Sequence, residues 1–209
     1  MTNERIELFR LLAAALSYPT REMRERVTAL GEALRGHRPE LDALLALEPD
    51  EGFYLRLFES QVAASPHETE YGLNRTTRKP IELADIAGFY RAFGVETRQD
   101  MVDHMAAELE FLAYLLIKEA YAEEQGWEEP RKITARAYAS FLEDHAGRWL
   151  DFLAERVDSV APGSFYALAT RLAARLVGEE VARLGLEPAR VNQVAPAPAE
   201  EMSCGGCPA

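Results

Sequence analysis

Residues 100–119 read DMVDHMAAELEFLAYLLIKE, and the spacing of their apolar side chains decides the fold class. Apolar residues recur three and four positions apart, which places them on one face of an α-helix. The main stripe contains Met101, Met105, Leu109, Leu112 and Leu116. We therefore predict a long helix over about residues 100–125 that buries this face against other helices.

Four ionisable residues lie close to the apolar face of this helix: Asp103, His104, Glu108 and Glu110. Glu108 falls between two apolar rows, where a carboxylate is costly unless it is paired or hydrogen-bonded. His104 precedes Glu108 by one helical turn and is its nearest candidate partner. Asp103 and Glu110 are expected to flank the stripe on its wetter sides.

The same helical spacing continues through most of the chain. Several helix boundaries are marked by a proline at the first helical position or by a glycine just after the last helical residue. Further helices are expected up to residue 18, at 20–36 with Thr20 as N-cap, at 39–47, at 53–62, at 80–94 with Pro80 in the first position, at 130–159 with a break near Gly147, and at 163–184. No stretch alternates long enough to indicate a sheet. The predicted fold class is all-α, with residues 1–186 forming a single compact helical domain.

Two segments depart from the helical pattern. Residues 63–79, AASPHETEYGLNRTTRK, are polar and rich in turn formers, so we predict a long loop that is functional or mobile. Residues 187–209 are rich in proline and alanine and are predicted to form a disordered tail. This tail ends in Cys204-Gly-Gly-Cys207, whose spacing is that of half a metal or redox site.

A second Asp-His pair, Asp144 and His145, lies in residues 140–153, SFLEDHAGRWLDFL. His145 falls within the inward apolar stripe of its helix, whereas Asp144 points away and can pair with Arg148 one turn later. A His/Glu pair at i,i+4 on each of two helices would indicate a di-metal site. The second helix offers no such pair, because Trp149 follows His145 at that spacing. We therefore predict no metal ligands.

Composition limits the classes of function. The net charge is −12, and no basic stripe indicates nucleic-acid binding. An acidic surface suits a basic partner, or it serves solubility alone. No apolar run approaches the roughly 20 residues that span a bilayer, so no stable membrane insertion is expected. The first residues, MTNERIELFR, lack the pattern of a secretory signal, and we expect a cytoplasmic location.

The buried acids and histidines leave several functions open. They can be core-edge histidines that satisfy neighbouring carboxylates, or His104, Glu108 and His145 can serve a helical metal-dependent hydrolase. The sequence contains neither a nucleophile motif nor a glycine-rich phosphate loop, so we favour a protein that is not an enzyme and predict no cofactor. A third alternative is an adaptor that binds a partner helix.

Three segments, taken in order, carry a resemblance to a known family. They read HETEYGLNRTTRKPIELADIAGFYRAFG, MVDHMAAELEFLAYLL and FLEDHAGRWLDFL. Together they resemble the TorD/DmsD/NarJ family of all-helical cytoplasmic chaperones, which assist the maturation of molybdenum-containing redox enzymes. The resemblance extends from about Ile6 to about Leu184 and does not include the CGGC tail.

The resemblance implies a client and a set of matching residues. Members bind the apo catalytic subunit of a molybdoenzyme, commonly through its twin-arginine signal peptide, and hold back export until the cofactor is inserted. The positions that match the family segments are Asp103 and His104, Asp144, His145 and Trp149, Glu68 and Tyr71, and Tyr90 and Phe93. A monomer and a dimer are both compatible with this resemblance.

A twin-arginine peptide has a basic start and an apolar middle, so its binding site needs carboxylates and an apolar groove. Candidate carboxylates are Asp103, Glu108, Glu68 and Glu70, and candidate groove residues are Phe89, Tyr90, Phe93 and Met105. The predicted client-binding set is Asp103, His104, Glu108, Glu68, Glu70, Tyr71, Tyr90, Phe93, Asp144 and His145. The simpler interpretation is that the apolar members are core and that Glu68 and Glu70 are solvated loop charges.

Overall fold

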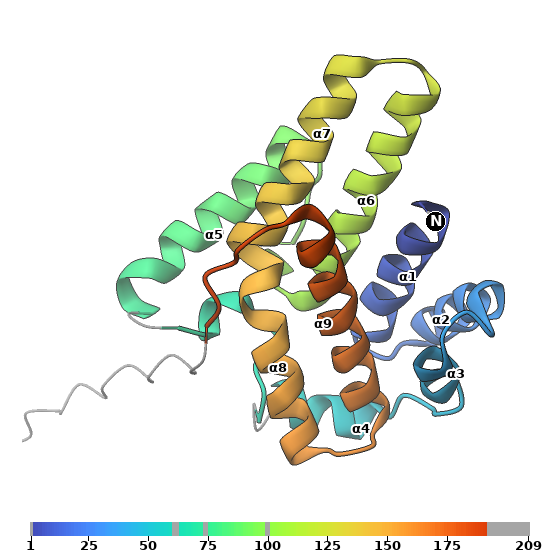
Figure 1. Cartoon of the computed structure of the whole chain (residues 1–209). Coiled ribbons are helices and arrows are strands. Elements are labelled where there is room, and N and C mark those ends of the chain that lie inside the picture. The colour runs from blue at the N-terminus through green and yellow to red at the C-terminus, as the bar shows by residue number, and fades with distance from the viewer. Residues whose placement is uncertain (1, 60–62, 73–74, 99–100, 192–209) are drawn as a thin grey trace, which may run out of the picture.

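Helices form most of the chain in the computed structural model, which describes residues 2–59, 63–72, 75–98 and 101–191 (Figure 1). In order they are α1 (Thr2–Ala15), α2 (Arg21–Leu34), α3 (Pro39–Leu45), α4 (Glu51–Tyr54), a π-helical turn (Leu55–Glu59), a 3-10 turn (Glu68–Glu70), α5 (Arg75–Ala92), α6 (Met105–Glu124), α7 (Glu128–Phe141), a π-helical turn (Leu142–Ala146), α8 (Gly147–Val160) and α9 (Phe165–Leu184). The described ranges contain no strand, and an isolated antiparallel bridge pairs His67 with His104. The predicted all-α fold is confirmed.

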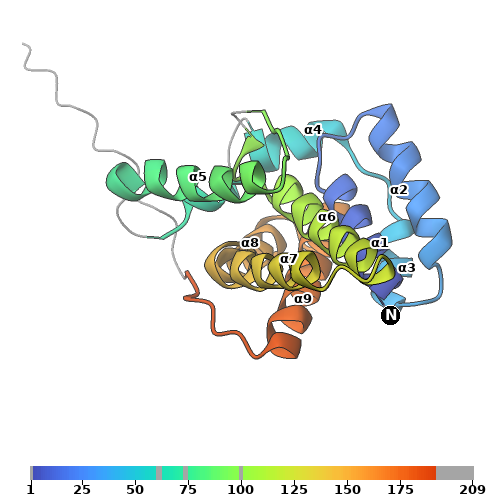
Figure 2. The ribbon, with the colours of Figure 1, turned by 90° about the horizontal axis from the view of Figure 1, so that it is seen from above.

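The last residues of α1 lie in the core. Those from Leu11 to Ala15 are apolar and all buried, whereas the first half of the helix carries partly exposed charged residues. α1 packs against α2, α6 and α9, while α7 packs against α6 and α8 packs against α9. Seen from above, α2 and α3 flank one side of this bundle and α5 lies on the opposite side (Figure 2). None of the described helices has the length and apolar composition needed to cross a membrane.

Several helix ends lie where the sequence predicts them. Thr20 caps α2 by accepting a hydrogen bond from Met23 N at 3.1 Å, and Ser164 caps α9 by accepting one from Ala167 N at 3.1 Å. These side chains satisfy backbone donors that have no partner inside the helix. Gly185, at φ +67°, then ends α9 in the left-handed conformation that glycine adopts without strain.

Two helix starts lie about five residues from their predicted positions. α5 begins at Arg75, so Pro80 lies inside the helix and the predicted loop at 63–79 ends earlier. Pro80 is the sixth residue of α5, where it cannot donate a backbone hydrogen bond to the carbonyl oxygen four positions earlier and its ring crowds that carbonyl. An Arg78–Glu82 ion pair at 2.9 Å supports the same turn. α6 begins at Met105 instead of near residue 100, because the preceding chain is bonded to residues 66–68.

The predicted break near Gly147 is a π-helical turn over Leu142–Ala146. A Cβ atom at position 147 would clash with the backbone oxygen of Leu142, which accounts for glycine at this point. The chain after α9 then returns across this turn, and Val191 N donates to Arg148 O at 2.9 Å. Defined contacts thus continue five residues into the segment predicted as a tail. Residues 192–209, including Cys204 and Cys207, lie outside the described residues.

Candidate functional site

Asp103 lies buried in the turn before α6, with 5% of its surface exposed. Its carboxylate accepts hydrogen bonds from His67 Nδ1 at 2.9 Å, Thr69 Oγ1 at 2.5 Å and Thr69 N at 3.2 Å. Burial acts to raise the pKa of Asp103, but the hydrogen bonds from His67 and Thr69 outweigh it and hold the pKa at about 2. The prediction that Asp103 faces the wetter side of a helix is therefore wrong, because the residue precedes the helix and anchors the segment at 67–69.

His104 caps α6 instead of lying within it. Its Nδ1 accepts a hydrogen bond from Ala106 N at 3.1 Å, and its Nε2 lies 3.4 Å from the hydroxyl of Tyr54. Because Nδ1 is an acceptor, the ring proton belongs on Nε2 and faces Tyr54. This geometry fixes the start of α6 to α4, which a histidine in the middle of a helix would not do.

Glu68 connects the segment at 67–71 to the second Asp-His pair. Its Oε2 accepts from His145 Nδ1 at 3.1 Å, and its Oε1 lies 3.4 Å from Arg148 Nη1. The same Arg148 nitrogen lies 3.6 Å from Glu82 on α5. Glu68 and His145 are both buried, so the simpler interpretation of Glu68 as a solvated loop charge is wrong.

Asp144 is exposed, in agreement with the prediction that it points away from the core. Arg148 Nη1 bonds the backbone oxygen of Asp144 at 3.0 Å, while its ion pairs are with Glu68 and Glu82. Arg148 therefore forms its ion pairs with carboxylates of other segments and not, as the i,i+4 spacing had suggested, with the Asp144 carboxylate. The π-helical turn changes the relative orientation of the two side chains.

Glu108 is completely buried in the middle of the molecule. Its Oε2 accepts a hydrogen bond from Trp149 Nε1 at 3.1 Å, and no hydrogen-bond partner for Oε1 is found among the described residues. Burial, followed by the negative charge of Glu68, raises the pKa of Glu108 well above its usual range. Trp149, rather than the predicted His104, is therefore the partner through which Glu108 is fixed.

Replacing Glu108 with glutamine should leave the folded protein equally stable or more stable near neutral pH. A raised folded-state pKa gives stability that is fully present below the unfolded value and is lost as pH rises through the folded value. Glutamine can still accept the hydrogen bond from Trp149 Nε1 but cannot ionise, so the variant does not lose this stability as pH rises. In urea unfolding from pH 5 to 8, the unfolding free energy of the variant should increase relative to that of the wild type as pH rises. A variant that is least stable relative to wild type at pH 8 would contradict this assignment.

The aromatic residues of the predicted set belong largely to the core. The Tyr71 hydroxyl donates to Ser65 O at 2.6 Å, and its ring lies 5.3 Å from that of Trp149. The Tyr90 hydroxyl donates to Val102 O at 3.0 Å. Phe93 is half-buried, as is Glu70, whose carboxylate pairs with Lys79 at 2.7 Å.

Five buried ionisable residues gather around the start of α6 and the π-helical turn, namely Glu68, Asp103, His104, Glu108 and His145, and we call them the acid–histidine cluster. The cluster brings together five of the ten predicted site residues, and it bonds the segment at 67–71 to α6 and to the π-helical turn. Sequence reasoning missed His67, Thr69 and Tyr54, which hold this cluster in place. Their contacts join positions some 34 to 50 residues apart, and no local spacing indicates such contacts.

An open groove lies beside this cluster, between the end of α5 and α6. We call it the aromatic groove; its volume is about 360 Å³ and it is lined by Tyr90, Val95, Glu96, Thr97, Ala107, Glu110, Phe111 and Tyr114. Of the predicted set, Tyr90 contributes to it directly. Glu96 and Glu110 were not predicted as site residues, although the expected wetter position of Glu110 is correct.

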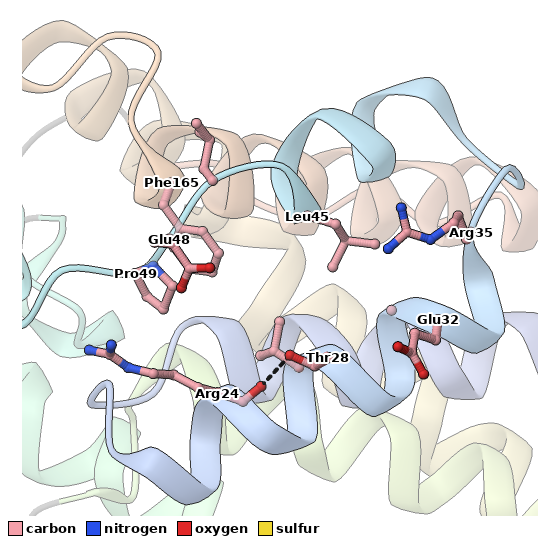
Figure 3. Close-up of a pocket in the computed structure, with 11 residues that line it drawn as sticks. Arg24, Thr28, Glu32, Arg35, Leu45, Glu48, Pro49 and Phe165 are labelled. Carbon is pink, nitrogen blue, oxygen red and sulfur yellow. Dashed lines mark hydrogen bonds between the residues drawn. The ribbon is translucent and has the colours of Figure 1, made fainter.

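A second hollow lies between α2 and the connection from α3 to α4 (Figure 3). Arg24 and Glu48 line one end and Glu32 and Arg35 the other, while the Thr28 hydroxyl donates to Arg24 O at 2.9 Å. Its volume is about 80 Å³, which holds a few water molecules rather than a peptide segment. The aromatic groove is therefore the better candidate for a binding site.

The hydrolase alternative finds no support in the geometry. Across the part of the chain that the structure describes, no three His, Cys, Asp or Glu side chains are grouped to hold a metal ion. His104 caps α6 towards Tyr54, whereas His145 bonds Glu68 from the π-helical turn. The two histidines thus have separate structural partners.

Comparison with known proteins places this arrangement in a family. The sequence model of the nitrate reductase delta subunit family matches residues 18–155, about two-thirds of the chain. The chain belongs to this family. The family assignment confirms the resemblance to the TorD/DmsD/NarJ chaperones that the three sequence segments indicate.

Individual relatives of this delta-subunit family member are assembly chaperones. The chlorate reductase assembly chaperone protein of Ideonella dechloratans is 31% identical over 188 residues, 88% of this chain and 91% of the relative. The selenate reductase assembly chaperone protein of Thauera selenatis is 30% identical over 189 residues, 88% of this chain and 91% of the relative. The perchlorate reductase assembly chaperone protein of Dechloromonas aromatica (strain RCB) is 28% identical over 143 residues, which cover 66% of this chain and 63% of the relative.

Proposed function

We propose that this delta-subunit family member is a cytoplasmic assembly chaperone for a molybdenum-containing oxidoreductase. It binds the cofactor-free catalytic subunit, including its twin-arginine signal peptide, and assists cofactor insertion before export. The observation that carries this proposal is the likeness, over 88% of the chain, to assembly chaperones of the chlorate and selenate reductases. A chaperone of this kind binds and releases its client without catalysing a reaction.

The acid–histidine cluster supports a binding role in an indirect way. Its residues are buried and already hydrogen-bonded, so their proposed contribution is to hold the walls of a binding surface. Asp103 fixes the turn before α6, and Tyr90 bonds Val102 in the same turn while its ring lines the aromatic groove. Rigid support of this kind lowers the entropy that is lost when a ligand orders a binding surface.

The chaperone function predicts that molybdenum occupancy of a client depends on this chain. A molybdenum reductase catalytic subunit encoded in the same genome should be co-expressed with and without it. We expect a complex of the two proteins, and several-fold less molybdenum in the subunit produced alone. The control is an iron–sulfur enzyme without molybdenum, whose metal content should not change. Equal molybdenum in both preparations, with no complex, would show that the proposed function is wrong.

A further inference from the structure

We propose that the aromatic groove binds a peptide segment in which arginine precedes apolar residues, and that Glu96 and Glu110 receive the arginine side chains. This inference rests on the proposed function, because it names the surface and the residues through which a client leader is recognised. It differs from the sequence-based prediction, which assigned the arginines to Asp103, Glu108, Glu68 and Glu70.

The acids of the cluster are poorly placed to receive an arginine from outside. Asp103, Glu68 and Glu108 are each at most 5% exposed, and Asp103 and Glu68 already bond histidines of the chain. Inserting a guanidinium among them would require breaking those bonds and desolvating a further charge. Glu110, by contrast, has 58% of its side chain exposed and lines the groove, as does the exposed Glu96.

The floor of the groove is apolar and rigid. The Phe111 ring lies 4.8 Å from that of Tyr90 and 6.4 Å from that of Tyr114. The hydroxyl of Tyr114 donates to Phe93 O at 3.1 Å, and that of Tyr90 donates to Val102 O, so both rings are fixed at their polar ends. Tyr90 and Phe111 are each only 2% exposed and form the packed base of the groove, so the half-buried ring of Tyr114 is the aromatic surface that offers a ligand apolar contact area, at a small cost in conformational entropy.

The chain's own cations already occupy the rim of this groove. Arg26 Nη2 donates to Glu110 Oε1 at 2.9 Å, and Lys118 Nζ lies 5.4 Å from the centre of the Tyr114 ring. Both contacts are at the surface, where an ion pair contributes only about 0–1 kcal/mol, so a ligand cation can displace them. The groove therefore presents a carboxylate and an aromatic face that accept positive charge.

Arginine fits this surface better than lysine does. Its planar guanidinium pairs with a carboxylate through two parallel hydrogen bonds and stacks on an aromatic ring, whereas an ammonium is a compact, strongly hydrated charge. The net charge of −12 further favours the approach of a basic segment. The groove volume of about 360 Å³ accommodates apolar side chains that follow the arginines.

Isothermal titration with synthetic peptides tests the inference on the full chain. The probe is a peptide with an arginine pair followed by a run of leucine and alanine, compared with the same peptide carrying lysine or glutamine pairs. Glu110→Gln and Glu96→Gln should each weaken binding of the arginine peptide by about two- to fivefold, with little effect on the glutamine peptide. Arg26→Ala removes the internal competitor and should strengthen binding by about threefold. Glu123→Gln, an exposed acid farther along α6, is the matched control and should change nothing.

Equal affinities of the wild type for the arginine and glutamine peptides would overturn the inference, as would no binding of either peptide. The client catalytic subunit separates this failure from failure of the function. If Glu96→Gln/Glu110→Gln retains full affinity for that subunit, the assignment of the groove is wrong while the chaperone function stands. If the wild type itself does not bind the subunit, the proposed function is wrong.

Discussion

Replacing Trp149 with alanine is expected to lower the free energy of unfolding by about 3–5 kcal/mol. Trp149 is completely buried, and its indole ring packs against Tyr71. Its Nε1–H is also the hydrogen-bond donor to the buried carboxyl group of Glu108. The substitution therefore opens a cavity and removes the partner of a buried polar group at the same time. A loss of this size is a large fraction of the roughly 5–15 kcal/mol that stabilises a typical domain.

Two variants separate the causes of this loss, with urea unfolding as the measurement. Trp149→Phe keeps most of the ring but not the donor, and it should cost about 1–3 kcal/mol. Trp127→Ala is the matched control, because Trp127 is 51% exposed in the turn between α6 and α7, and its cost should be much smaller. Similar losses for Trp127→Ala and Trp149→Ala would contradict the central position of Trp149.

Replacing Asp103 with asparagine is expected to destabilise the protein by about 2–3 kcal/mol near neutral pH. The folded-state pKa of about 2, against a usual value of 3.8, corresponds to about 1.4 kcal/mol for each unit. A lowered folded-state pKa gives stability that is present above pH 3.8 and is lost as pH falls towards 2. The difference between variant and wild type should therefore be largest above about pH 4 and shrink at lower pH.

Unfolding free energies measured from pH 3 to pH 7 test this prediction. Asp144→Asn is the control, since Asp144 is exposed and should have little effect at any pH. A constant difference between Asp103→Asn and the wild type over this range would show that the carboxylate is not held ionised by His67 and Thr69. Asp103→Asn should also increase hydrogen exchange in residues 67–71, which Asp103 anchors.

Local signals in the sequence account for the fold class and for many helix boundaries. Thr20, Ser164 and Gly185 act through their own neighbouring backbone, so their effects are visible in short windows. The apolar stripe of α6 likewise predicts which of its faces is buried. The break near Gly147 was predicted as well, although its form is a π-helical turn that packs against α6 and α9, which local spacing does not show.

The site was harder to predict, because the same residue types serve burial and binding. The spacing of the sequence predicts that Asp103 lies within the helix. In the structure, the bridge between His67 and His104 holds this part of the chain outside the helix, and α6 begins at Met105. Glu68 lies in a polar segment that looks solvated, yet His145, 77 positions away, covers it. Glu110 lies within one of the three family segments but has no special spacing there, and the proposed role of Glu96 and Glu110 depends on aromatic side chains that α5 and α6 bring together.

The most direct test of the chaperone account is a comparison of cofactor-free and cofactor-loaded client. The chain should be mixed with each form of a molybdenum reductase catalytic subunit that retains its leader, and complexes measured by size exclusion with light scattering. The account predicts a stable complex with the cofactor-free subunit and at least tenfold weaker binding of the loaded one. Equal binding of both forms, or binding of neither, would contradict it.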